Sequence, residues 1–134
     1  MTTPGRLTDR LLTVAGTVIG LWGGFLLAIY TMFITPYRIG TVLIPLSIVL
    51  AIAGNAALIW FTYTATGNKW LGLLPGLVWV ALTFFGADRT TEGDLVLSQR
   101  NWVATVYLFA GAATVGIAAY RLIVPKPPPL TPRR

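Results

Sequence analysis

Four long apolar stretches separated by short polar segments make up most of this chain. They cover about residues 11–34, 41–61, 70–87 and 102–124, and all 14 charged side chains lie at the end of a stretch or between two. Hydrocarbon excludes charge and requires backbone polar groups to bond within their own segment, so each stretch predicts a membrane-crossing helix. The pattern predicts an all-α integral membrane protein of one domain. Its four transmembrane helices would form an antiparallel up-down bundle.

The connections carry clear turn signals. A tight turn is expected over residues 35–40, because Pro36 ends a helix and Gly40 lets the chain reverse. Pro45 then falls in the first turn of the second stretch, and Gly67-Asn68 marks the next reversal. Pro75 is expected to bend the third helix. The longest loop covers residues 88–101, and the proline-rich basic tail, residues 125–134, is expected to be extended.

Composition supports a membrane protein and removes much chemistry. Hydrophobic residues make up 55% of the chain and charged residues 10%, against roughly 25% charged in a typical soluble domain. The first stretch is too long for the apolar region of a signal peptide, which indicates a retained helix. The chain has no cysteine and no histidine, which excludes zinc–thiolate sites, His-ligated haem, cysteine nucleophiles and histidine bases. We therefore expect no cofactor, no metal site and no catalytic residue.

Basic residues predict the orientation. With four crossings, one side of the membrane carries seven of the ten: Arg6, Arg10, Lys69, Arg121, Lys126, Arg133 and Arg134. The other side carries Arg38, Arg89 and Arg100. The positive-inside rule then places both termini in the cytoplasm. Arginine outnumbers lysine eight to two, a composition that resembles proteins of high-GC bacteria, so we expect a bacterial cell membrane. The net charge of +6 is explained by anionic lipid headgroups, and no basic cluster of the kind that binds nucleic acid is present.

Small residues recur at four-residue spacing in three of the stretches. Such spacing places them on one helix face, where another backbone can approach closely. The expected helix-packing positions are Gly16, Gly20, Gly24, Gly72, Gly76, Ala112 and Gly116. We favour packing within the bundle over a groove for a partner helix or a lipid chain.

Asn55 is the most polar side chain inside a predicted span. Buried in a bundle, it would bond across helices, contributing about 0.6–2 kcal/mol, or line a substrate cavity. The structural role is favoured. No charged residue occupies the core of any span, which argues against an ion- or proton-coupled carrier.

The only dense polar cluster lies between the third and fourth stretches. This outer loop contains Asp88, Arg89, Glu92, Gly93 and Asp94. The spacing does not match a calcium-binding EF-hand loop. A solvated turn is the favoured interpretation, ahead of a partner-docking loop and well ahead of metal binding or catalysis.

The run Arg89-Thr90-Thr91-Glu92-Gly93-Asp94-Leu95-Val96-Leu97, followed by Tyr107-Leu108-Phe109-Ala110-Gly111, resembles a family of small actinobacterial membrane proteins with four predicted spans. That family has no established activity, and Thr90 stands here where its members often have proline. The resemblance implies the same topology and nothing about chemistry.

The sequence therefore favours a non-catalytic accessory or assembly subunit of a larger membrane or envelope complex. Its partners would be the lipid bilayer and other membrane protein subunits. The alternative is a passive carrier or flippase-like protein for a lipid or lipid-linked sugar. A laterally open cavity containing Asn55 would favour that carrier.

Overall fold

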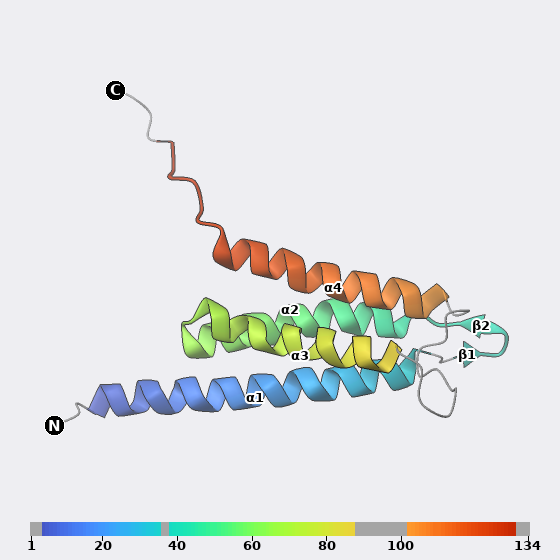
Figure 1. Cartoon of the computed structure of the whole chain (residues 1–134), viewed down its shortest axis with the longest axis horizontal. Coiled ribbons are helices and arrows are strands. Elements are labelled where there is room, and N and C mark those ends of the chain that lie inside the picture. Colours follow the sequence, from blue (N-terminus) through green and yellow to red (C-terminus); the bar gives the residue numbers. More distant parts are fainter. Residues whose placement is uncertain (1–3, 36–37, 88–101, 131–134) are drawn as a thin grey trace.

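The computed structural model describes residues 4–35, 38–87 and 102–130. It is all-helical apart from one short hairpin (Figure 1). The four helices are α1 (Pro4–Ile34), α2 (Leu46–Thr66), α3 (Lys69–Ala87) and α4 (Trp102–Ile123). All four are long and apolar enough to cross a membrane. The hairpin joins α1 to α2 and consists of β1 (Arg38–Ile39) and β2 (Val42–Leu43).

The first connection differs from the simple turn expected over residues 35–40. β1 and β2 pair antiparallel, with Arg38 opposite Leu43, and Gly40 makes the reversal at a φ of 63°. The second helix therefore begins at Leu46, not near residue 41. Pro45 is the physical reason, because a proline disfavours helical geometry in the residue before it and stands here as the N-cap.

Two helices extend beyond their apolar stretches. α1 begins at Pro4 and is 31 residues long, and α2 continues to Thr66. Polar residues at the ends of a helix can still be helical. Hydropathy alone therefore places the start of α1 too late and the end of α2 too early. α2 stops at Gly67, whose φ of 65° is left-handed and whose N–H donates to the Tyr63 carbonyl at 2.8 Å. Asn68 then caps the start of α3, because its Oδ1 accepts the Trp70 N–H at 2.9 Å.

The helices do not share their contacts equally. α1 packs along both α2 and α3, while α4 packs against α2 and α3. In Figure 1, α4 diverges from the other helices toward its C-terminal end. The beginning of α1 and the end of α4 lie toward one end of the molecule, and the hairpin lies at the other.

The described part of the molecule buries polar side chains beside its apolar core and exposes many large apolar side chains. Six polar side chains are at most 1% exposed: Thr31, Thr35, Ser47, Asn55, Thr62 and Thr83. Large apolar side chains face outward, among them Phe33 (77% exposed) and Phe85 (79% exposed). Water-soluble proteins bury such residues, so this exterior is suited to hydrocarbon.

Candidate functional site: the closed polar core

α1 and α3 come into close backbone contact at Gly24. A Cβ atom added at Gly24 would lie 2.5 Å from the carbonyl oxygen of Pro75 and 3.0 Å from its Cα. One turn earlier, a Cβ at Gly20 would lie 3.1 Å from the Pro75 ring and 3.1 Å from the Thr62 methyl group. Since the atoms facing Gly24 belong to backbone, they have little freedom to move away. Because Gly20 and Gly24 carry no side chain, α1 and α3 can touch at these positions.

The other glycines expected at packing positions on α1 and α3 also lie against neighbouring helices. A Cβ added at Gly16 would lie 2.8 Å from the Cβ of Ala65, and one added at Gly72 would lie 2.8 Å from the Cβ of Tyr63. Gly76 faces Ile59 and Val115, each at 2.9 Å. These positions are used inside the bundle and are therefore not free to receive a further helix.

The fourth helix is different. Ala112 is half-buried, but no described atom lies within 4 Å of a Cβ placed at Gly116, which is exposed. Gly111 is the glycine of α4 that packs, because the Trp79 ring fills the space where its side chain would be. The spacing of Val103, Tyr107, Gly111 and Val115 on the buried face marks this position. The four-residue spacing of small residues did not predict Gly111 as a packing position.

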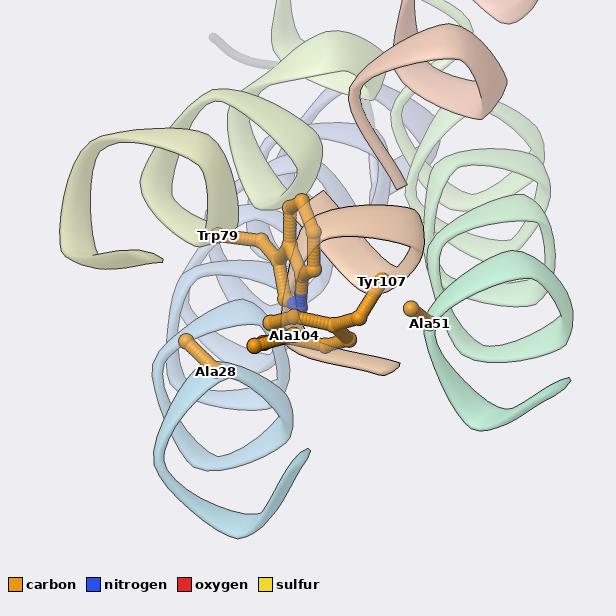
Figure 2. Close-up of a cluster of buried hydrophobic side chains, with 5 residues drawn as sticks. All are labelled: Ala28, Ala51, Trp79, Ala104 and Tyr107. Atoms are coloured by element: carbon orange, nitrogen blue, oxygen red, sulfur yellow. The ribbon is translucent and has the colours of Figure 1, made fainter. Parts of the chain in front are cut away.

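Trp79 and Tyr107 form the centre of the bundle. Figure 2 shows them pointing toward each other from α3 and α4, with Ala28 of α1 and Ala51 of α2 on either side. Their ring centroids are 5.2 Å apart with an interplanar angle of 67°, an edge-to-face arrangement. Both side chains are fully buried. The small alanines on α1 and α2 leave room for these two large rings.

Hydrogen bonds across three helices surround these rings. The Tyr107 hydroxyl is 2.7 Å from the Thr31 hydroxyl and 3.4 Å from the Thr83 hydroxyl. The Trp79 Nε1–H points to the Thr31 hydroxyl at a longer 3.4 Å. Thr31 therefore links α1 to both α3 and α4. Sequence patterns give no indication of this link, because Thr31 and Tyr107 are 76 residues apart.

The threonine hydroxyls also bond within their own helices. Seven of them donate to the carbonyl four residues earlier at 2.6–2.9 Å: Thr13, Thr17, Thr31, Thr35, Thr66, Thr83 and Thr114. Such bonds satisfy a hydroxyl without requiring a partner from another helix.

Asn55 lies in the interior on the buried face of α2. Its amide nitrogen donates to the Ala51 carbonyl of the same helix at 2.9 Å, so the cross-helix bond expected from the sequence is not made by this group. The Asn55 Oδ1 has no hydrogen-bond partner among the described groups, and neither do the hydroxyls of Ser47 and Thr62. α2 therefore contributes polar atoms that are buried but only partly satisfied.

Two shallow hollows lie on the outside of the bundle. One, of about 610 Å³, lies between α1 and α2 and is lined almost entirely by apolar residues such as Leu26 and Leu58. The second, of about 410 Å³, lies between α2 and α4 and includes Arg121. Neither hollow is lined by Asn55, which is fully buried.

The outer loop expected to be polar lies outside the described residues. This applies to Asp88, Arg89, Glu92, Gly93 and Asp94, so their roles stay predictions. Asp9 is the only acidic side chain among residues 4–35, 38–87 and 102–130.

Comparison of the chain with models of known protein families, with curated proteins and with solved structures finds no match. The resemblance to small actinobacterial membrane proteins therefore stays a prediction. What the described core can do follows from its own groups. Its hydroxyls, one amide and two rings carry no charge, and they hold helices in fixed positions.

Proposed function

We propose that the protein is a multi-pass protein of the bacterial cell membrane, whose four helices cross the bilayer in up-down order. The apolar exterior and the buried hydroxyls support this, because they are the arrangement that hydrocarbon favours. In Figure 1, the beginning of α1 and the end of α4 lie toward the same end of the molecule, which is compatible with an even number of crossings. The seven-to-three distribution of basic residues supports cytoplasmic termini.

The absence of cysteine makes this topology directly testable. Three single-cysteine variants are suitable because each site is exposed: Gly5→Cys, Ile39→Cys and Leu130→Cys. In intact spheroplasts, a membrane-impermeant maleimide should label the hairpin cysteine at 39 and spare the other two. All three should react after the membrane is disrupted. Labelling of positions 5 and 130 from opposite sides would contradict the proposal.

Within the membrane, we propose a non-catalytic role as an accessory or assembly subunit. The observation that carries it is the length of α1. Its 31 residues extend about 46 Å at about 1.5 Å per residue, against about 30 Å of hydrocarbon. In Figure 1, the first turns of α1 project past the turn between α2 and α3.

These projecting turns carry apolar side chains that no described helix covers. Leu7 and Leu11 are four residues apart, share one face and are 57% and 63% exposed. Arg6 and Arg10 occupy the neighbouring face. An apolar face that no described helix covers, on turns that project past the neighbouring helices, favours contact with a helix of another membrane protein. The subunit role depends on this contact.

The test is co-purification in a gentle detergent, using two double variants of the same turns. The chain should carry a stoichiometric membrane protein partner, and Leu7→Ser with Leu11→Ser should reduce its recovery at least about tenfold. That estimate assumes burial of each leucine is worth about 1.5–3 kcal/mol. Arg6→Gln with Arg10→Gln is the matched control and should retain the partner. A solitary chain, or equal loss in both variants, would refute the subunit role.

A cavity that opens sideways and contains Asn55 would favour the carrier alternative, but Asn55 is enclosed and bonded to its own helix.

A further inference from the structure

The hollow between α2 and α4 combines an apolar lining with a basic end. It exists where α4 diverges from the other helices (Figure 1). Its volume of about 410 Å³ falls within the roughly 300–1,000 Å³ of pockets that hold small ligands. Buried Ile59 forms part of its floor, and small side chains such as Ala56 and Ala118 keep it open.

The length of the hollow matches one leaflet of a bilayer. Along α2 it runs from Ile52 to Tyr63, and along α4 from Thr114 to Leu122. At about 1.5 Å per residue these distances are roughly 16 Å and 12 Å, close to half of an approximately 30 Å hydrocarbon core. A single acyl chain lying along the helices therefore fits its extent.

One end of the hollow is basic and aromatic. Arg121 lines it there, in the last turn of α4, and Trp60 and Tyr63 stand in the last two turns of α2. Aromatic and basic side chains at helix ends mark the depth of lipid headgroups. Arg121 also lines a second hollow, of about 450 Å³, with Lys126, and Tyr63 lines a smaller one, of about 290 Å³, with Lys69.

The positive charge at this end of the hollow has no acidic partner among the described residues. Arg121 forms no ion pair with any residue of the described ranges, where Asp9 is the only carboxylate. The larger hollow between α1 and α2 has no charged side chain in its lining. Charge complementarity thus selects the α2–α4 hollow and an anionic occupant.

We propose that this hollow binds one anionic phospholipid from the bilayer, with an acyl chain along Ile59 and the headgroup phosphate paired with Arg121. Arg121 can donate two parallel hydrogen bonds to a phosphate. Lys69 and Lys126 add positive charge around the headgroup. The lipid would fill the space between the C-terminal parts of α2 and α4. Its binding would not require any protein partner.

The test uses the purified full-length chain, stripped of lipid and mixed in detergent with phosphatidylglycerol or phosphatidylcholine. Native mass spectrometry then counts the lipid retained. The chain should retain phosphatidylglycerol in preference to phosphatidylcholine. Arg121→Gln should reduce that preference about fivefold, equivalent to about 1 kcal/mol for one basic side chain at a headgroup. Arg121→Lys should keep most of it, and Arg38→Gln, at the hairpin, should leave it unchanged.

A second pair of variants tests the acyl-chain site without altering charge. Ala56→Phe should fill the hollow and remove retention of both lipids. Ala53→Phe, an exposed alanine one turn away that does not line the hollow, should not. Equal retention of the two lipids by the unaltered chain would overturn the proposal. So would an Arg121→Gln variant that behaves like Arg38→Gln, or an Ala56→Phe variant that behaves like Ala53→Phe. Because only one protein is present, these outcomes are independent of whether the chain is a subunit.

Discussion

Replacing Gly24 by valine is expected to separate α1 from α3 and to destabilise the bundle by about 3 kcal/mol or more. The new side chain would meet the Pro75 backbone, which cannot turn aside as a flexible side chain would. Overpacking of this kind typically costs about 1–3 kcal/mol, and rigid backbone contacts lie at the upper end or beyond it. Unfolding of the detergent-solubilised protein with increasing sodium dodecyl sulfate, followed by tryptophan fluorescence, measures the loss.

Gly116→Val is the matched control for this prediction. It makes the same substitution within a helix, at a position with no described atom within 4 Å of the new Cβ. Helix propensity therefore changes in the same way in both variants, and only the contact differs. Similar unfolding midpoints for the two variants would show that the α1–α3 contact is not as close as described.

Replacing Trp79 by alanine is expected to cost about 3–5 kcal/mol of folding free energy, the range for removing a buried aromatic ring. The variant loses the edge-to-face contact with Tyr107 and leaves a space among all four helices, where Gly111 has no side chain to fill it. Trp79→Phe should cost less, because a ring remains. The same titration can be followed by circular dichroism at the helical band.

Trp102→Ala provides the comparison, since Trp102 is 55% exposed and lies at the start of α4. Its loss should change stability by no more than about 0.5 kcal/mol, as is usual for surface positions. Equal destabilisation by the two alanine substitutions would refute the central position of Trp79.

Hydropathy was sufficient to predict the four helices but not how they meet. A long uncharged run has few alternatives to a helix, so each apolar stretch predicted its element. The hairpin over residues 38–43 was missed because proline and glycine signal a reversal without specifying its form. Five glycines on α1 and α3 lie against other helices, as four-residue spacing led us to expect, whereas Gly116 does not. Spacing identifies a face and not the neighbour opposite it.

The polar core was the least predictable part. Nothing local indicates that Thr31 would bond Tyr107, or that Trp79 alone among the tryptophans would be buried while Trp22, Trp60, Trp70 and Trp102 are exposed. Those outcomes depend on the rotation of each helix about its axis, which is decided by packing between segments distant in the chain. Asn55 shows the same limit. The sequence placed it inside a predicted span, but its bond to the Ala51 carbonyl could not be read from the sequence.

The hydroxyl bonds to carbonyls one turn back have a consequence for biogenesis. If the helices cross the bilayer as proposed, most threonine hydroxyls would already be satisfied within their own segment during insertion and would add little penalty among lipid tails. Ser47, Asn55 and Thr62 of α2 are the exceptions. α1, α3 and α4 could thus be inserted one after another with few unmet hydrogen bonds. Their later association then depends on shape, through glycine and ring contacts, more than on a search for missing hydrogen bonds.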